Sequence, residues 1–419
     1  MKEINPSTSF RINGERSRTI KNLNKAAERI KKAIKNKEKI ILYGDADLDG
    51  VASVIILKEA IKNLNGEVSS VYFPDREVEG YGISETGLNY LKKFSPGLLI
   101  AVDCGIGNFK EVKLAKKFGF EVIVIDHHEI LDKLPEAKII VDPKQKGDKY
   151  HFKELATVGI IYKLSELLFK DKMTENLRRN FLELTALATL ADMMPLKYDN
   201  EIFVKDGFKS LENSWRPAIQ ALLKTNELNH WLSPAKRDEE GDEAGPQRPL
   251  NLNQKVSKII SILNVRDIAP QHTPGGVPAS FKLLTISSLE ESKKLIERLL
   301  EKSFQRKEIM EKILNIIEER ISVKEEPIIF EGDENFEFTL ISSIASRLCQ
   351  KYQKPTFIFK KLEKESQGTV RTPAGIDSVA LMKKCKKYPM TYGGHPQASG
   401  FRIKNEKLEE FKECLIKNL

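Results

Sequence analysis

The sequence predicts an α/β protein in which a parallel-sheet domain is joined by a long helix to a smaller second α/β domain. Three observations support this prediction. From Lys39 onward, short β-branched runs alternate with helix-like segments, which is typical of a parallel sheet covered by helices on both faces. The stretch Leu289–Val323 is amphipathic and has no internal helix breaker. From Glu326, strand-like and helix-like segments resume.

Composition narrows the class of protein. The chain has 419 residues, of which 40% are hydrophobic and 31% charged, as in an ordinary globular protein with two or three domains. The formal charge of +9 is compatible with a polyanionic partner but does not establish one. No apolar run is as long as a membrane span and the N-terminus has no signal-peptide pattern, so we expect no membrane association and a cytoplasmic protein.

The four cysteines show no paired CxxC spacing. We therefore expect neither a zinc site nor a disulfide framework. Cys104, beside Asp103, is interpreted as a small buried residue rather than as a thiolate ligand.

The first region opens with an N-terminal helical arm, residues 1–37, whose apolar residues recur at helical intervals over Asn22–Lys35. Its basic face either is solvated or touches nucleic acid. The strands that follow are predicted at residues 41–44, 68–73, 98–103, 120–126 and 138–142, with helices at 51–64, 83–94 and 109–118. After Val141 the pattern is mainly helical, over 155–169 and 175–193.

We divide the chain into four parts: the arm 1–37, a parallel-sheet domain 38–260, a connector with the long helix 261–325, and a second domain 326–419. Residues 233–250 are polar and contain Gly and Pro, which indicates a flexible loop or insertion. In the second domain we expect strands at 327–331 and 355–361, and helices at 344–352, 375–385 and 408–418.

The most informative stretch is Ile40–Gly50, IILYGDADLDG, where a buried strand leads into Asp45, Asp47 and Asp49 at alternate positions. If the strand continued past Tyr43, the three carboxylates would point into the crevice at the carboxyl edge of the sheet. Like charges that converge there repel one another unless a cation lies between them. The alternative is an acidic turn in which Asp49 merely caps the following helix.

Four further features lie where an α/β sheet binds its ligand. Asp103 follows an apolar strand, and VIVIDHHE ends another strand with Asp126, His127 and His128. Asp192 ends an apolar helix before Pro195, and YGGHPQASGF carries a glycine pair and a histidine near the C-terminus.

Each feature alone has a structural explanation, such as a turn Asp, exposed histidines or a helix cap. Together, carboxylates from separate segments and an adjacent imidazole pair predict a metal site. Hard oxygen ligands with one imidazole suit Mn²⁺ or Mg²⁺, and the absence of thiolate pairs argues against structural zinc. His151, His230 and His272 have no such context and are interpreted as loop or surface residues.

These motifs carry a resemblance. DADLDG, VDCGIGN, IDHHE and LATLADMMPL resemble the four ordered motifs of the DHH phosphoesterase superfamily, and GGHPQASGF resembles the signature of its DHH-associated domain. Within the superfamily the chain is most similar to the RecJ single-strand exonuclease family. The segment Arg76–Ser84 resembles the segment between that family's first two motifs, and Asp199–Leu222 its helical segment after the fourth.

The resemblance implies a pair of Mn²⁺ or Mg²⁺ ions, with Asp103 as the bridging ligand. The implied ligands are Asp45, Asp47, Asp49, Asp103, His127 and Asp192. His128 would face the phosphate as a hydrogen-bond donor or general acid, and Asp126 would orient the histidine pair from behind. Two such ions support phosphodiester hydrolysis without a protein nucleophile.

The C-terminal unit would bind the phosphate of the substrate. Gly393 and Gly394 let backbone amides approach it, and Arg371 and His395 would add charge-assisted hydrogen bonds. The chain departs from the family's pattern around ISILNVRDIAP, where Asn264 is the residue that matches a substrate-binding position. QGTVRTP matches only loosely and leaves Arg371 as the phosphate-binding counterpart.

The resemblance therefore implies a metal-dependent exonuclease of single-stranded DNA, with 5′-to-3′ polarity and a role in DNA repair or recombination. We expect a monomer that prefers DNA to RNA and has repair or replication proteins as partners. A DHH oligoribonuclease that cleaves short oligonucleotides is the alternative enzyme. A non-catalytic replication scaffold is the alternative outside enzymes, but such relatives lose motif carboxylates that this chain keeps.

Overall fold

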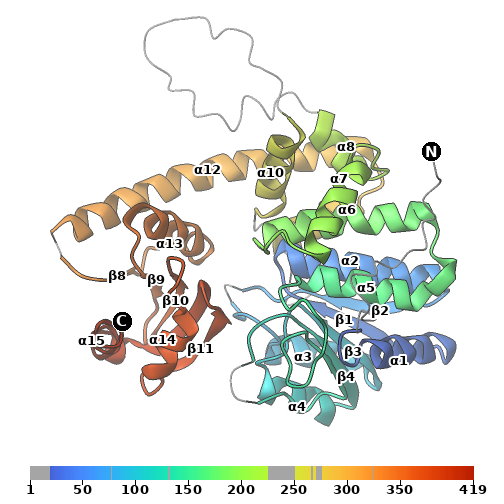
Figure 1. Cartoon of the computed structure of the whole chain (residues 1–419), viewed down its shortest axis with the longest axis horizontal. Coiled ribbons are helices and arrows are strands. Elements are labelled where there is room, and N and C mark those ends of the chain that lie inside the picture. Colours follow the sequence, from blue (N-terminus) through green and yellow to red (C-terminus); the bar gives the residue numbers. More distant parts are fainter. Residues whose placement is uncertain are drawn as a thin grey trace, which may run out of the picture. The chain divides into compact units, whose positions relative to one another are not determined.

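The computed structural model of the chain (Figure 1) describes residues 19–76, 78–130, 133–224, 251–265, 268–269, 276–323 and 325–419. His230, His272 and the predicted loop 233–250 lie outside these residues. The chain divides into two compact units: Met1–Leu223 with Ile268–Ser288, and Lys224–Asp267 with Leu289–Leu419. The four-part division predicted from the sequence remains a proposal.

The first unit is built on a five-stranded parallel sheet, which confirms the predicted fold class. The strands are β1 (Ile40–Gly44), β2 (Val68–Tyr72), β3 (Gly97–Val102), β4 (Phe120–Ile125) and β5 (Ile139–Val141), in the order β2-β1-β3-β4-β5. Every neighbouring pair is parallel. Because parallel strands share one carboxyl edge, the acidic residues that follow β1, β3 and β4 meet there.

Helices cover both faces of this sheet, as the alternation predicted (Figure 1). These helices are α1 (Leu23–Lys35), α2 (Leu48–Asn63), α3 (Glu85–Leu91), α4 (Phe109–Lys117) and α5 (Thr157–Phe169). Further helices are α6 (Glu175–Ala191), which packs on α2 and α5, α7 (Asp199–Leu211), α8 (Pro217–Lys224) and α11 (Ala279–Thr285). A short ladder pairs β6 (Ile268–Ala269) with β7 (Val277–Pro278).

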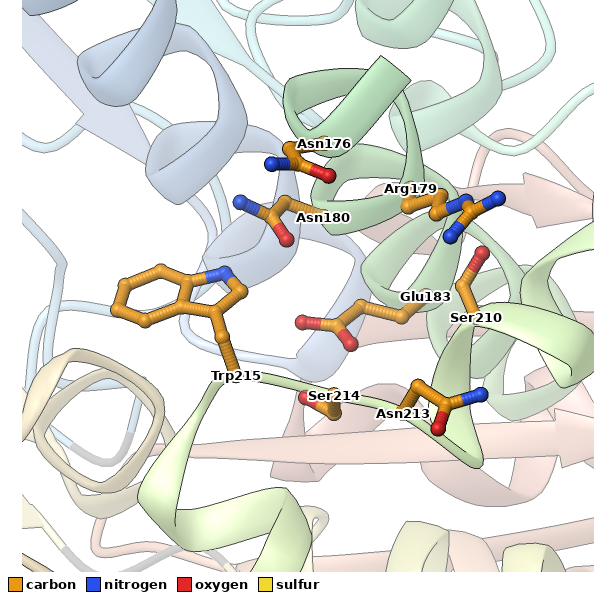
Figure 2. Close-up of a pocket in the computed structure, with 8 residues that line it drawn as sticks. All are labelled: Asn176, Arg179, Asn180, Glu183, Ser210, Asn213, Ser214 and Trp215. Carbon is orange, nitrogen blue, oxygen red and sulfur yellow. The ribbon is translucent and has the colours of Figure 1, made fainter.

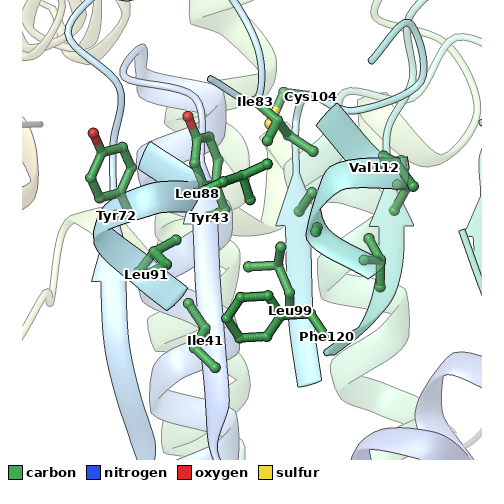
Figure 3. Close-up of a cluster of buried hydrophobic side chains, with 14 of the residues drawn as sticks. Ile41, Tyr43, Tyr72, Ile83, Leu88, Leu91, Leu99, Cys104, Val112 and Phe120 are labelled. Atoms are coloured by element: carbon green, nitrogen blue, oxygen red, sulfur yellow. The ribbon is translucent and has the colours of Figure 1, made fainter. Parts of the chain in front are cut away.

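Alternate strand residues form a core with α3 and α4 (Figure 3). Ile41 and Leu99 from the strands pack there with Leu88 of α3 and Val112 of α4. Strand positions one residue away point to the opposite face of the sheet, and Leu42 and Ile100 are equally buried there. Both faces of the sheet are therefore buried, which explains why the sequences of these strands are continuous apolar runs.

The second unit contains a mixed sheet in the order β11-β12-β10-β9-β8. Its strands are β8 (Ile329–Asp333), β9 (Thr356–Lys361), β10 (Glu365–Arg371), β11 (Pro389–His395) and β12 (Ala398–Lys404). Only β8 and β9 pair in parallel. The helices are α10 (Leu252–Leu263), α12 (Leu289–Ser322), α13 (Phe338–Tyr352), α14 (Ser378–Lys384) and α15 (Leu408–Lys417).

Sequence reasoning missed β10, β11 and β12. Glycines and polar residues interrupt the apolar alternation in these segments, so that it is short even in β12, and antiparallel partners complete their backbone hydrogen bonds. The long amphipathic stretch does form one helix, α12, and its Ile313, Leu314 and Ile317 pack into a core that contains α13.

The expectation that the chain has no disulfide is wrong. Cys385, at the end of α14, is bonded to Cys414 of α15, with their Cα atoms 6.0 Å apart. The two cysteines are 29 residues apart in the sequence, so no local spacing pattern predicted the disulfide. The packing of both helices on the same apolar core, which includes Met382 and Phe411, brings them together. Among the helices that the structure describes, none is long and apolar enough to cross a membrane.

Candidate metal centre

The strand ends before the acidic motif, so the three carboxylates do not alternate along a continued strand as the sequence suggested. β1 ends at Gly44 and α2 begins at Leu48, with Asp47 as its N-cap. The Asp47 carboxylate accepts hydrogen bonds from the backbone N–H groups of Asp49 (3.1 Å) and Gly50 (3.2 Å). Asp47, rather than Asp49, therefore caps the helix. A Cβ at position 50 would collide with the backbone of Asp45, so this tight turn requires glycine.

Asp45 is fully buried and paired with Arg76. The Arg76 Nε donates to Asp45 Oδ1 (2.7 Å), and its Nη2 donates to Asp47 Oδ2 (3.0 Å). The guanidinium also lies over the ring of Tyr81, 5.2 Å from its centroid. One fixed cation therefore already balances part of the charge on the first two carboxylates.

Asp49 points to the beginning of α5. Its two carboxylate oxygens accept hydrogen bonds from the backbone N–H groups of Thr157 and Val158, each at 2.8 Å. Ala156, the residue before α5, cannot cap that helix with its side chain, so Asp49 serves this helix end instead. Burial, together with the charge of Asp47, raises the pKa of Asp49 to about 7 despite these hydrogen bonds.

Asp103 follows β3 in a left-handed conformation, with φ of +60°. Asp tolerates this region better than most residues, and the turn directs its carboxylate back toward the sheet edge. Its Oδ1 accepts a hydrogen bond from Thr157 Oγ1 at 3.0 Å. Burial raises the pKa of Asp103 well above its usual value, and the charges of Asp49 and Asp47 raise it further.

His127 brings these carboxylates together. Its Nε2 lies 3.4 Å from Asp103 Oδ1, 3.5 Å from Asp192 Oδ2 and 3.8 Å from Asp49 Oδ2. These separations are long for hydrogen bonds but short enough for side chains that share a cation. Side-chain ligand atoms of Asp49, Asp103 and His127 all lie within 4.8 Å of one another, as do those of Asp45, Asp47 and Asp103. Asp103 belongs to both groups.

Asp192 occupies the position after α6, where the helix presents its carbonyl end. A carboxylate is unfavourable there because the dipole of the helix is negative at this end. Its Oδ2 is buried and accepts no hydrogen bond from any described residue. Burial raises the pKa of Asp192 well above its usual value, with further contributions from Asp49 and Asp47. His128 and Lys144 oppose this rise only in part, so the position of Asp192 favours the binding of a cation.

A second layer of contacts holds the histidine pair. Asp126 Oδ1 accepts hydrogen bonds from the backbone N–H groups of His127 (2.8 Å) and His128 (3.2 Å), and contacts His128 Nδ1 at 2.7 Å. Burial alone would raise the pKa of Asp126, but His128 holds it below the ordinary range. In turn, Asp126 raises the pKa of His128 despite its burial. His128 is therefore stabilised as an imidazolium.

Three residues of the site were not predicted. Arg76 and Tyr81 lie in the segment already noted between the first two motifs, but neither was assigned a role. The Tyr81 hydroxyl donates to the carbonyl oxygen of Asp103 (3.1 Å) and contacts the ring nitrogens of His128. Thr157 carried no local signal, because its contact with Asp103 exists only once α5 packs on the sheet.

The structure thus gathers eight predicted residues at one edge of the first sheet: Asp45, Asp47, Asp49, Asp103, Asp126, His127, His128 and Asp192. Cys104, beside them, is buried, and burial raises the pKa of its thiol, as expected for an inert neighbour. His151 is exposed on the surface, near Asp199.

The remaining predicted residues belong to the second unit. Arg371 of β10 and His395 of β11 both pair with Ala398 of β12, so they lie in one row on the same face of that sheet. Gly393 and Gly394 precede His395 on the same edge strand. Asn264 is exposed at the end of α10 and is not part of this row.

Two family models match the chain: the DHH family N-terminal domain over residues 39–189 and the DHHA1 domain over residues 325–419. Each falls on one of the two units described above. The chain is thus similar to a DHH N-terminal domain over the first range and to a DHHA1 domain over the second.

Over most of its length the chain is also similar to RecJ exonucleases. The chain is 29% identical over 400 residues to the single-stranded-DNA-specific exonuclease RecJ of Bacillus subtilis strain 168, a match that covers 94% of this chain and 47% of the relative. It thus spans about half the length of that relative.

Solved structures agree on the fold. Exonuclease RecJ bound to manganese superposes with a TM-score of 0.71 at 23% identity, over 96% of both chains. RecJ of Thermus thermophilus in complex with Mn²⁺ superposes with a TM-score of 0.75 at 22% identity, over 97% of this chain and 55% of that one.

Proposed function

We propose that this chain is a divalent-metal-dependent exonuclease that hydrolyses single-stranded DNA from the 5′ end. The observation that carries the proposal is the meeting of Asp49, Asp103 and Asp192 around His127 Nε2, where burial and the neighbouring carboxylates raise the pKa values of all three acids. The RecJ relatives are named for this activity, and two of the solved structures contain manganese.

The donor set suits Mn²⁺ or Mg²⁺. Carboxylate oxygens with a single imidazole nitrogen are the ligands such ions take, and the buried Asp192 Oδ2 without a described hydrogen-bond donor fits a ligand atom. The residues that would hold two ions are Asp45, Asp47, Asp49, Asp103, His127 and Asp192. Asp103 belongs to both ligand groups and is the proposed bridge. Asp45 and Asp47 already share a guanidinium partner, Arg76.

The chain's own residues would orient and protonate the substrate. A bound pair of ions supplies an activated water and stabilises the leaving oxygen. His128, held as an imidazolium by Asp126, donates to a phosphate oxygen or acts as a general acid. Tyr81 keeps the ring of His128 in place through its hydroxyl. Thr157 orients the carboxylate of Asp103 through its hydrogen bond.

The second unit contributes groups that suit an anion. We propose that Arg371 and His395, in one row of the sheet, bind a substrate phosphate, with the backbone of Gly393 and Gly394 beside them. Asn264, exposed at the end of α10, is proposed as a further substrate contact. A preference for DNA over RNA, a cytoplasmic location, a monomeric state and partners in DNA repair or recombination complete the proposal.

The test uses single-stranded DNA and RNA, each labelled at either end, together with a dinucleotide, in Mn²⁺. We expect release of mononucleotides from the 5′ end of DNA, abolished by excess chelator and by Asp103→Ala. Preferential cleavage of the dinucleotide or of RNA would instead assign a short-oligonucleotide phosphodiesterase. Turnover that survives chelation would exclude the metal mechanism. Absence of both turnover and Mn²⁺ binding by calorimetry would identify a non-catalytic scaffold.

A further inference from the structure

A polar hollow in the first unit lies away from the acidic cluster, where the end of α2, the start of α6 and the loop between α7 and α8 meet (Figure 2). It consists of two adjoining cavities of about 300 and 510 Å³ that share Asn180 and Trp215. Asn180 and Asp192 are about 18 Å apart along α6, at 1.5 Å per residue. Lys62 and Asp49 stand at opposite ends of α2 in the same way. The hollow is therefore separate from the proposed metal centre.

Trp215 forms one wall of the hollow, and its ring contacts the buried guanidinium of Arg216. Its side chain is 52% exposed, although the guanidinium carbon of its neighbour Arg216 lies 5.0 Å from its ring centroid. Arg216 is completely buried and donates to Glu183 Oε1 (2.9 Å) and to both carboxylate oxygens of Glu59 (3.0 Å). Its Nη1 donates to the carbonyl oxygen of Leu284 (3.0 Å). A flat aromatic surface is thus held in place and still open to solvent.

Side-chain amides line the hollow, and their hydrogen-bonding capacity is not used by the protein. The amides of Asn176, Asn180 and Asn213 make no hydrogen bond to any other described residue. Each offers two N–H donors and one carbonyl acceptor. In Figure 2 the Asn180 amide faces the same opening as the Trp215 indole. Such amides can pair with the polar edge of a heterocyclic base.

The border of the hollow carries an exposed cation. The two carboxylates of the hollow, Glu59 and Glu183, are both engaged by Arg216. Lys62 borders the second cavity, is exposed, and forms no ion pair with the residues that the structure describes. A phosphate could pair with this ammonium without displacing an internal partner.

An exposed, rigid aromatic face, unused amides and an unengaged cation together match one class of ligand. Aromatic rings stack on nucleobases, amides recognise base edges, and a lysine binds phosphate. We propose that this hollow binds an unpaired nucleotide, with its base on Trp215 and Asn180 and its phosphate at Lys62. The nucleotide is either free or part of a single strand. This site is independent of the proposed catalysis, since it contains none of the metal-centre residues.

The binding experiment needs no turnover. The chain has two tryptophans, Trp215 and Trp231, so Trp231→Phe leaves Trp215 as the only indole reporter. In the full-length Trp231→Phe chain, with excess chelator present, deoxyadenosine 5′-monophosphate should quench the fluorescence saturably. Deoxyribose 5-phosphate, which has no base, should not. If a short single-stranded oligonucleotide binds about tenfold more tightly than the mononucleotide, the hollow holds part of a strand; otherwise it is a site for free nucleotides.

Substitutions locate the site. Asn180→Leu in the reporter chain should weaken nucleotide binding about tenfold. Lys62→Ala should weaken it several-fold and remove its dependence on salt, whereas Lys113→Ala, an exposed lysine of α4 with the same charge change, should not. Trp215→Leu, measured by calorimetry, should abolish the binding heat. Quenching that is equal with deoxyribose 5-phosphate, or unchanged in Asn180→Leu, would overturn the proposal, as would no quenching at all.

Discussion

The two sheets carry their polar residues in opposite ways. In the first unit, carboxylates from the ends of β1, β3 and α6 converge, and burial and the charges of their acidic neighbours raise the pKa values of Asp49, Asp103 and Asp192. In the second unit, a guanidinium and an imidazole lie in a row of partly exposed sheet residues. The first arrangement calls for cations and the second for an anion, which are the two components of a metal-assisted phosphodiester hydrolysis.

The two arrangements also differ in their effect on the stability of the folded protein. Buried like charges destabilise a protein until a counter-ion binds, whereas partly exposed cations remain solvated and cost little. Arg371 is held by hydrogen bonds to Thr369 Oγ1 (3.0 Å) and Ser346 Oγ (3.1 Å). We therefore expect the acidic cluster to destabilise the first unit in the absence of metal, and we expect no such effect from Arg371 and His395 in the second unit. The predictions below test this contrast.

The largest effect is expected for Asp103→Asn. Loss of the shared carboxylate should lower the rate of DNA hydrolysis by at least about a hundredfold. In chelator the same variant should be more stable than the parent, by about 1 kcal/mol, since one buried negative charge is removed and the amide oxygen can still accept from Thr157. Initial rates in Mn²⁺ and denaturant unfolding in chelator measure the two effects. Asp171→Asn, at an exposed position in the same unit, should change neither. A less stable chelated variant would contradict the idea of uncompensated charge.

Arg371→Ala should act on substrate binding alone. Loss of a charge-assisted hydrogen bond to phosphate is expected to raise KM about tenfold, with kcat little changed. Stabilisation of the protein by Mn²⁺, followed as the shift in Tm, should be the same as in the parent, because the proposed metal ligands are in the other unit. Arg347→Ala, an arginine of α13 paired with Glu311, serves as the control for charge. A loss of Mn²⁺ stabilisation in Arg371→Ala would contradict the proposal that the first unit binds the metal and the second binds the phosphate.

Gly394→Ala should destabilise the second unit by about 2–3 kcal/mol. Gly394 has φ of +133°, and a Cβ there would lie 2.6 Å from the carbonyl oxygen of Ala398. Gly375→Ala is the matched control, since φ is +93° but no atom lies within 4 Å of the added carbon, and it should cost only about 1 kcal/mol. Denaturant unfolding of both variants separates backbone strain from steric collision. Equal losses would show that the close approach at Gly394 does not matter.

The smallest effect concerns pH and the buried Glu183. Burial raises the pKa of Glu183 from 4.5 to about 7, although Arg216 opposes the rise. A raised folded-state pKa adds stability that is complete below the unfolded value and is lost as pH rises through the folded one. The parent should therefore lose about 1 kcal/mol or more relative to Glu183→Gln between pH of about 4.5 and 7. Urea unfolding across that range measures it, with the exposed Glu212→Gln as control. Parallel pH profiles for parent and Glu183→Gln would refute it.

Local pattern was sufficient for the order of strands and helices in the first unit. Continuous apolar runs such as Ile40–Gly44 and Gly97–Val102 indicate strands that are buried on both faces. In a parallel sheet, the residues that follow such strands lie at the same edge. The convergence of Asp49, Asp103 and His127 could therefore be expected from the sequence. The β10–β12 strands could not, because glycines and polar residues interrupt their apolar alternation and their antiparallel pairing is not a local property.

The sequence by itself determined which residues could bind a metal, because residue type and position after a strand are local properties. Only the tertiary structure decided which partner each residue takes. Asp49 serves the start of α5 across 108 positions, Arg76 pairs with Asp45, and Cys385 reaches Cys414. Such partners come from segments that are distant in the chain and meet only through packing, so no local spacing encodes them.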